Sequence, residues 1–267
     1  MGKESEKLVK EFLESKLSGK WENLMTFDFR QLHHYGKFGS PGRSFDCDDT
    51  NIMRAIYSIL WEDDIPFLHD NNFGCRKQYR GDTMNTFHTM FGREIEGKPG
   101  FFAGLEKYAP SDELREKVRQ FGKLCCNIGN YAVLPNWFAK GTTLNCYRGI
   151  NEWHDFFDRF LIELHKVMTG CGSQDETLQE LVKVNDFCFR KFKGDRAWQN
   201  FIRILLLEDY CGNSGKPQNI FNMNYHWMNE NAREKYLADA EIYLEKTGKL
   251  IRNRAEKMIS ILKSKIR

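Results

Sequence analysis

The sequence predicts a mainly α-helical, single-domain protein with a bundle-like architecture and at most one short strand or small sheet. Seven or eight segments show the apolar spacing of amphipathic helices, whereas few show the alternation typical of a strand. No repeat, low-complexity tract or Pro/Ser-rich linker divides the 267 residues, so one domain over 1–267 is expected. Apolar residues make up 41% and aromatic residues 14%, which indicates a core built largely from ring packing.

The N-terminal part of the chain predicts two helices separated by an irregular loop. Apolar residues three and four apart within 4–17 predict an amphipathic helix. Gly and Pro residues among aromatic rings predict an ordered but irregular loop over 21–43. Asp48 or Asp49 is expected to cap a second helix, which Pro66 should end.

The middle of the chain predicts a short helix, a longer helix and one extended segment. Asp82 is expected to be the N-cap of a helix that runs through Phe91. Ser111 is expected to start the longer helix, and Gly129 to end it. Residues 127–136 favour either a short strand or an ordered strap, and the pattern does not choose between them.

The C-terminal part of the chain carries the clearest helical signal. Apolar residues over 152–169 fall on one helical face and predict a core helix. Further helices are predicted at 175–192 and 195–211, and a long terminal helix at 232–267. The terminal helix has an apolar seam with a period near 3.5, to which Arg254 is the one exception.

The charge and the cysteine content limit the classes of protein to which this chain can belong. Forty basic and 37 acidic residues give a net charge of +3, which argues weakly against bulk nucleic-acid binding. No apolar run is long enough for a membrane span, and the Lys/Glu-rich start of the chain predicts neither export nor lipidation. The eight cysteines lack the spacing of zinc or redox motifs, so a cytoplasmic protein with reduced thiols is expected.

A first candidate site lies where a loop is predicted to enter a helix. Arg80, Asp82 and Asn85 bring together a cation, a capping carboxylate and a small amide. Backbone amides at such a helix start can hold an anion, and Arg80 could bind phosphate or carboxylate in a bidentate manner. The alternative is a structural cap with a salt bridge between Asp82 and Arg80, since capping is the commonest use of Asp there.

A second candidate site is the Asn-rich segment 127–136 with the residues that follow it. Asn130, Asn136 and Arg148 are its candidate ligand-binding residues. Loops held by Asn side chains often line sites, but Asn and Gly are also the ordinary residues of turns. The alternative is therefore a strap over the core that binds no ligand.

The predicted helix at 152–169 carries His154, Asp158 and His165 beside its apolar face. On an ideal helix the two histidines lie about 16 Å apart, too far to bind one ion. We therefore predict no metal site unless His33, His34 or His88 adds further ligands, interpret Asp158 as a charge at the rim of the core, and leave the cofactor unknown.

The segment 246–267 holds eight Lys or Arg residues against one acidic residue, Glu256. A surface for RNA, DNA or an anionic membrane is one interpretation. The other is structural, because cations near a helix C-terminus complement the helix dipole.

Several short motifs over about residues 45–170 resemble a loosely related set of bacterial proteins, from gut Firmicutes among others, that are catalogued as domains of unknown function. The resemblance implies a bacterial domain in which these positions cluster, and it implies no established activity. The motifs are Trp61 and Pro66 in Leu-Trp-x4-Pro, Asp82, Asn127-Ile128-Gly129-Asn130, Leu134-Pro135-Asn136, Asn145-x2-Arg148-Gly149 and Asp155-x2-Asp158-Arg159-Phe160.

Two function hypotheses follow. In the first, the helix entry, the Asn-rich segment and Arg148 converge on a pocket for a phosphate- or nucleotide-containing ligand, with His88 and Asp155 as candidate catalytic proton-transfer groups. In the second, the protein is a non-catalytic interaction module whose basic terminal helix binds a protein or nucleic acid through its seam and its Lys/Arg face. A seam buried against the chain's own helices would argue against the second.

Overall fold

The fold is described from a computed structural model of the chain. The residues it describes are 2–33, 36–40, 46–61, 63–65, 79–86, 111–135, 139–150, 156–185, 192, 196–220 and 233–266. Only the backbone is described for residues 79, 80, 135, 149, 150 and 233–238.

The predicted fold class is confirmed, because the described chain is mainly helical and has one two-stranded sheet. The α-helices are α1 (Gly2–Leu17), α2 (Asn51–Trp61), α4 (Asp112–Cys125), α5 (Leu144–Ile150), α6 (Phe157–Thr169), α7 (Glu176–Val184), α9 (Ala197–Ile204) and α10 (Arg233–Lys265). Short 3-10 helices are η1 (Trp21–Met25), η2 (Phe29–Gln31), η3 (Cys47–Asp49), η7 (Ile128–Asn130) and η9 (Glu208–Tyr210).

The sheet is an antiparallel pair of strands, β1 (Tyr79–Thr83) and β2 (Tyr131–Pro135). The extended segment that the sequence left open is therefore a strand. Thr83 lies opposite Tyr131 and Asp82 lies opposite Ala132. Because side chains alternate between the faces of a strand, Thr83 and Asp82 point to opposite sides of the ribbon.

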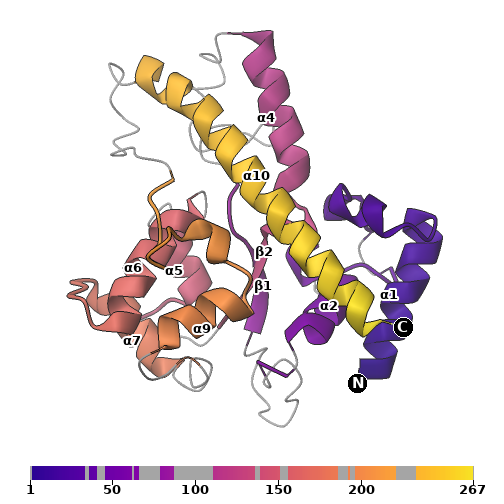
Figure 1. Cartoon of the computed structure of the whole chain (residues 1–267), viewed down its shortest axis with the longest axis horizontal. Helices are drawn as coiled ribbons and strands as arrows, with labels where there is room; N and C mark the ends of the chain where they lie inside the picture. Colours follow the sequence, from indigo (N-terminus) through magenta and orange to yellow (C-terminus); the bar gives the residue numbers. More distant parts are fainter. Residues whose placement is uncertain are drawn as a thin grey trace.

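The ribbon lies between two groups of helices, and α10 crosses in front of it (Figure 1). One group consists of α5, α6, α7 and α9, and the other contains α1 and α2. Helix α10 contacts α4, η7, α2 and η1 along its length. The last helix of the chain thus connects segments that are far apart in the sequence.

Aromatic rings fill the core beside α1, as the composition predicts. The Phe12 ring meets the edges of Phe27 and Phe38, each with its centroid 5.2 Å away. Phe29 continues the cluster to Tyr131 on β2, with ring centroids 5.9 Å apart. Edge-to-face pairs of this kind bury large apolar area in a favourable geometry.

The helix starts agree with the sequence in part. The hydroxyl of Ser111 accepts a hydrogen bond from the Leu114 amide, which makes Ser111 the N-cap of α4 as predicted. The predicted capping of α2 by Asp48 or Asp49 is wrong. The Thr50 hydroxyl accepts from the amide of Met53 instead.

The prediction that Asp82 caps a helix is also wrong. Asp82 lies within β1, and residues 84–86 are not helical. Residues 87–91, which would form the rest of that helix, lie outside the described residues. The Arg-Gly-Asp composition resembles a helix entry, but backbone pairing with β2 decides the conformation.

Other boundaries shift by a few residues. Helix α4 ends at Cys125 rather than near Gly129, because the Asn127 side chain accepts from the Gly129 amide and starts η7. Helix α9 ends at Ile204, and Leu206 has a φ of 57°, which turns the chain before η9. Helix α6 begins at Phe157, and residues 152–155 of the predicted helix lie outside the described part.

The long terminal helix is confirmed as α10, and its apolar seam is buried within the protein. Most of the predicted seam residues are buried, namely Ala240, Tyr243, Thr247, Arg254 and Met258, while Leu250 and Ile261 are partly buried against the core. A seam used for packing inside the chain is not available to a partner, so docking through the seam is excluded.

Candidate functional site

The structure brings together four of the residues that the sequence singled out, namely Asp82, Asn85, Asn130 and Arg148. Asp82 points from β1 toward α5, where it forms an ion pair with Arg148. The predicted salt bridge between Asp82 and Arg80 involves a side chain outside those described. We call these four residues the polar junction.

Arg148 is fully buried and makes several contacts inside the protein. Its Nη2 donates to the backbone oxygens of Thr83, at 3.2 Å, and Met84, at 3.1 Å. Its guanidinium lies 5.0 Å from the ring centroid of Phe157 and 5.3 Å from that of Phe160. A guanidinium stacked on rings and paired with a carboxylate is stabilised without a ligand.

Asn130 holds the two strands and the end of α4 together. Its Nδ2 donates to the backbone oxygens of Asn85, at 2.6 Å, and Cys125, at 2.9 Å. Its Oδ1 accepts from the Asn85 amide at 3.1 Å. Because Asn130 is completely buried, these hydrogen bonds satisfy polar groups that would otherwise be costly to bury.

Asn85 extends the polar junction to three further elements. Its Nδ2 donates to the Tyr210 hydroxyl at 2.7 Å, and its Oδ1 accepts from the Phe157 amide at 3.2 Å. The Tyr243 hydroxyl of α10 lies 3.5 Å from the same Oδ1. Burial raises the pKa of Tyr210, so its hydroxyl stays neutral at ordinary pH.

Three predicted site residues, His88, Asn136 and Asp155, lie outside the described residues. Arg80 lies on β1 opposite Leu134, and only its backbone is described. The four residues of the polar junction converge as expected, but the contacts described for them are internal. The assignment of all these residues to an anion site stays a prediction.

Arg254 is a buried residue of α10 whose role the sequence did not identify, although it stood out as the exception in the seam. Its guanidinium donates to the backbone oxygens of Leu205, Gly129 and Tyr131 at 2.7–3.1 Å. Burial lowers the pKa of Arg254 to about 10. The residue therefore connects α10 to β2 and to the turn after α9.

Asp48 is a buried acid that the sequence interpreted only as a possible cap. Its Oδ2 accepts from the Thr83 hydroxyl at 3.3 Å, and its backbone oxygen accepts from Tyr57 at 2.8 Å. Its Oδ1 has no hydrogen-bond partner among the described residues. Burial, followed by the nearby Cys47 and Asp49, raises the pKa of the Asp48 carboxyl well above its usual value.

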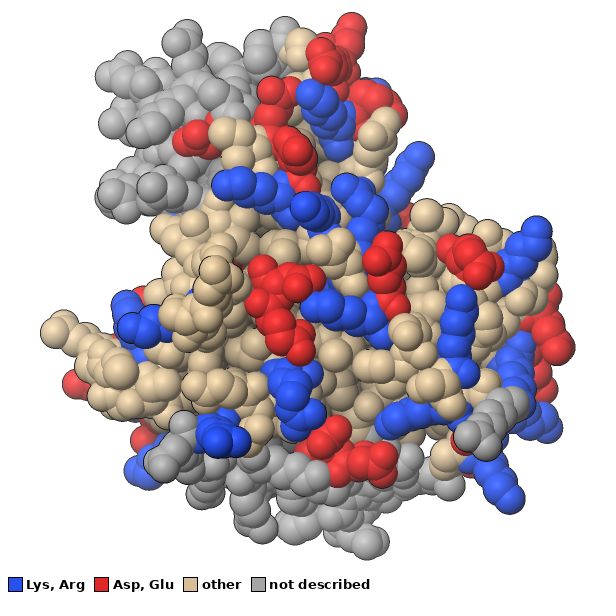
Figure 2. All heavy atoms as spheres, in the orientation of Figure 1, with Lys and Arg blue, Asp and Glu red and all other residues tan. Residues whose placement is uncertain are grey.

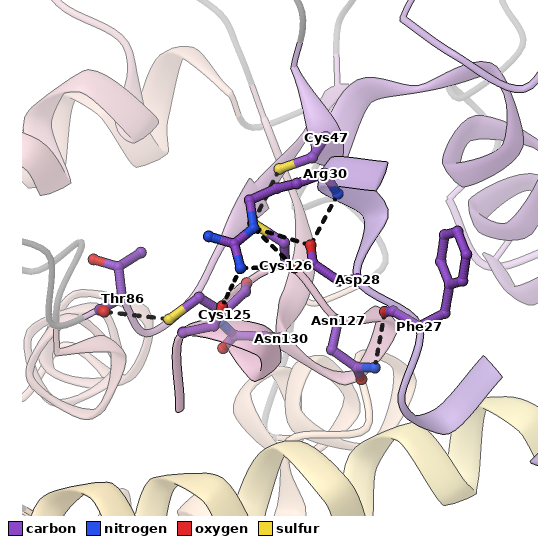
Figure 3. Close-up of polar contacts among 10 residues, drawn as sticks. Phe27, Asp28, Arg30, Cys47, Thr86, Cys125, Cys126, Asn127 and Asn130 are labelled. Carbon is purple, nitrogen blue, oxygen red and sulfur yellow. Dashed lines mark hydrogen bonds and ion pairs between the residues drawn. The ribbon is translucent and has the colours of Figure 1, made fainter. Parts of the chain in front are cut away.

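Two thiols lie together beside this acid. The Sγ atoms of Cys47 and Cys126 are 3.3 Å apart, and Figure 3 shows Arg30 and Asp28 next to them. Arg30 pairs with Asp28 and also donates to the backbone oxygen of Gly122 at 2.9 Å. No sequence motif could reveal this pair, because 79 positions separate the two cysteines.

The polar residues of α6 do not form a metal site in the described structure. Asp158 is buried, which contradicts its interpretation as a rim charge, and its Oδ2 accepts from the Ile220 amide at 2.8 Å. The His165 ring packs on Trp198 with centroids 4.8 Å apart, and His154 lies outside the described residues. Among the described residues, no group of three or more His, Cys, Asp or Glu side chains could hold a metal ion.

A shallow hollow on the surface lies between α6 and the start of α7. It is lined by Arg159, Ile162, Glu163 and Asp175. The Asp175 carboxylate already caps α7 and accepts from the Tyr147 hydroxyl at 2.9 Å. The hollow contains none of the predicted site residues.

The basic C-terminal segment divides into cations used inside the protein and cations on its surface. Lys257 pairs with Asp209, Lys263 with Glu22, and Lys265 with the backbone oxygen of Ile59. The surface cations Lys246, Lys249 and Arg252 are exposed at three-residue spacing, and we call them the basic stripe.

The basic stripe has no ion-pair partner within the part of the chain that the structure describes. Figure 2 shows Lys and Arg side chains along and beside α10, with Asp and Glu side chains between them. Glu245 and Glu256 are acidic residues of the same outward face. This surface is mixed in sign rather than uniformly basic.

No protein-family model, curated protein or solved structure matches this chain. The resemblance inferred over residues 45–170 therefore stays a prediction. No helix in the described part of the chain is long and apolar enough to cross a membrane.

Proposed function

We propose that the protein is a non-catalytic interaction module that binds an acidic helical segment of another protein along the outward face of α10. The contact surface is the basic stripe with Ile242, one turn before it. The sequence predicted that a partner would bind partly through the apolar seam. Because the seam is buried, we place the contact on the opposite face of the same helix.

The single observation that carries this proposal is the difference between two sets of cations in one helix. Lys257, Lys263 and Lys265 lie beside carboxylates of the protein itself. Lys246, Lys249 and Arg252 are exposed and lack such a carboxylate among the described residues. Unpaired cations on one helical face steer and orient an acidic partner.

The composition of the face favours a protein over a nucleic acid. Glu245 and Glu256 lie among the cations, and a uniformly negative phosphate backbone would meet them, whereas a helical partner can place its acidic residues against the cations and other residues against the glutamates. Ile242 is 49% exposed and is the large apolar side chain that stands out on the described surface. An apolar contact flanked by charges is the usual arrangement of a helix that packs on another helix.

The proposal includes a cytoplasmic location. It is supported by the free thiols of the described cysteines, because structural disulfides are typical of exported proteins.

Affinity capture with quantitative mass spectrometry tests the function. The bait is the full chain, used as wild type and with Lys246→Glu, Lys249→Glu and Arg252→Glu combined. The control bait carries Lys3→Glu, Lys7→Glu and Lys16→Glu, which makes the same change in charge on exposed positions of α1. We expect a protein that the wild type and control baits retain and the α10 variant loses, with nuclease treatment of the extract making no difference.

Two results would contradict the proposal. One is a retained protein that all three baits bind equally. The other is binding that disappears after nuclease treatment, which would indicate a nucleic-acid partner. Far-ultraviolet circular dichroism of each bait checks that the substitutions leave the helices intact.

A further inference from the structure

Cys47 and Cys126 lie within contact distance although they come from different parts of the fold. Cys47 is the first residue of η3, just before α2, and Cys126 follows the last residue of α4. Their Sγ atoms are 3.3 Å apart, so only a small movement separates this dithiol from a disulfide. Both are free thiols in the structure.

The two thiols differ in access. Cys47 is partly exposed, whereas only 5% of the surface of Cys126 is reachable by solvent. Cys47 is therefore the more accessible residue of the pair. Cys126 is placed to attack the product, because its sulfur already touches that of Cys47.

The ion pair between Arg30 and Asp28 lies beside the two thiols. Arg30 interacts electrostatically with Cys126 and Cys125, and Asp28 holds its guanidinium through contacts of 2.6–3.0 Å. Figure 3 shows this guanidinium beside the thiol pair. The hydrogen bond to Cys126 and burial raise the pKa of the Cys47 thiol, and the thiolate is the form that reacts in thiol–disulfide exchange, so the reaction should become faster as the pH rises.

We propose that Cys47 and Cys126 are a redox modification site that forms a reversible intramolecular disulfide by exchange with a low-molecular-weight disulfide such as oxidised glutathione. The Cys47 thiolate attacks one sulfur of the oxidant, forms a mixed disulfide and releases one reduced glutathione. The Cys126 thiolate then attacks the Cys47 sulfur and releases the second. Two protein thiols are oxidised, one glutathione disulfide is reduced to two thiols, and the two thiol protons pass to the leaving thiolates.

The bond would link covalently two segments that now meet through noncovalent contacts. It would close a loop of 79 positions between the entry of α2 and the exit of α4. Long closed loops lose much chain entropy in the unfolded state, so the oxidised protein should resist unfolding more than the reduced one. The site would thus couple the redox state of the surroundings to the stability of the fold.

The test uses the wild-type chain in buffers of graded reduced-to-oxidised glutathione ratio. After acid quenching, free thiols are alkylated and the digest is read by mass spectrometry. We expect a linked peptide containing Cys47 and Cys126, while the exposed Cys146 and Cys171 carry glutathione adducts. The linked form should also melt several degrees higher than the reduced form.

Variants separate the pair from its neighbours. In Cys126→Ser, the reaction at Cys47 should stop at the glutathione adduct. The matched control Cys125→Ser changes the adjacent residue and should keep the Cys47–Cys126 bond. A bond between Cys125 and Cys126, or both Cys47 and Cys126 still free when Cys146 and Cys171 are fully modified, would overturn the proposal. The wild-type result decides the question even if a variant does not fold.

Discussion

Arg254 shows how one buried side chain can hold three segments in place. Replacing it with Met keeps most of the volume but leaves the backbone oxygens of Leu205, Gly129 and Tyr131 without their donor. Each unsatisfied buried acceptor costs about 1–3 kcal/mol, so Arg254→Met should lower the free energy of unfolding by about 3 kcal/mol or more. Urea unfolding measures this loss.

The control for that experiment lies two positions away. Arg252 is exposed on the same helix, and Arg252→Met should change the stability by less than about 0.5 kcal/mol. Equal losses for the two variants would mean that the Arg254 contacts do not stabilise the fold.

Asp48 should make the stability depend on pH. Burial raises the pKa of its carboxyl, so the folded chain keeps the proton to a higher pH than the unfolded chain does. The contribution of Asp48 to stability is therefore fully present below the unfolded pKa, about 3.9, and is lost as the pH rises through the folded pKa. Asp48→Asn removes this loss while its amide oxygen still accepts from Thr83.

We therefore expect Asp48→Asn to be more stable than the wild type at pH 7, by about 1–3 kcal/mol. The difference should shrink toward pH 4, because the wild-type carboxyl is then neutral too. Unfolding curves at several pH values measure it, and a gap that widens in acid would refute this account of Asp48.

For single residues, the sequence predicted which side chains come together better than it predicted what those side chains do. It singled out Asp82, Asn85, Asn130 and Arg148, and the structure places all four in one junction. Arg148 was expected to face a ligand, but a cation can equally be held by rings and carbonyls from distant elements. Nothing in local sequence distinguishes these two environments.

Gly129 is the point where the element η7 meets α10. A Cβ added there would lie closer to the Ile251 backbone oxygen and the Ala255 amide than real Cβ atoms come. Gly129→Ala must therefore push α10 away from η7, and we expect a loss of about 1–3 kcal/mol or more. Chemical denaturation of the variant gives the value.

Gly36→Ala is the matched control, because within the described part of the chain its added Cβ meets one atom, at an ordinary 3.5 Å. It should leave the stability nearly unchanged. If Gly129→Ala is tolerated equally well, then η7 and α10 do not pack as closely as described.

Most helices could be predicted because their apolar spacing is local information. That spacing located α1, α2, α4 and α10 to within a few residues. Strand β1 was missed because Arg80, Gly81 and Asp82 carry no alternating apolar pattern. Its conformation depends on hydrogen bonding to β2, about fifty positions later, which no local pattern contains.

Across the whole molecule, α10 completes the core. Ala255, Met258 and Leu262 are fully buried, and they belong to one core with residues of α1, α2 and α6. A chain that ends at residue 232 should therefore fail to fold cooperatively. Loss of the near-ultraviolet circular dichroism signal and of a sharp thermal transition would show this, whereas a cooperative melt near the wild-type temperature would contradict it.

The long-range arrangement marks the limit of what the sequence predicts. A long terminal helix follows from its period, but which elements it contacts depends on how distant segments pack. The same is true of the Cys47–Cys126 contact, whose partners belong to different elements. The charge count also overestimated the positive charge that segment 246–267 presents at the surface. Arg254 is buried, and other cations of the segment have partners inside the protein.

The most direct test of the proposed function is photo-crosslinking from the outward face of α10. A photoreactive amino acid at Lys249 should capture one protein partner, and Lys246→Glu with Arg252→Glu should abolish that product. The same group at Lys183, an exposed position on α7, should capture nothing comparable. A product at both positions, or one at Lys249 that survives the two charge reversals, would contradict the claim that this face binds an acidic partner.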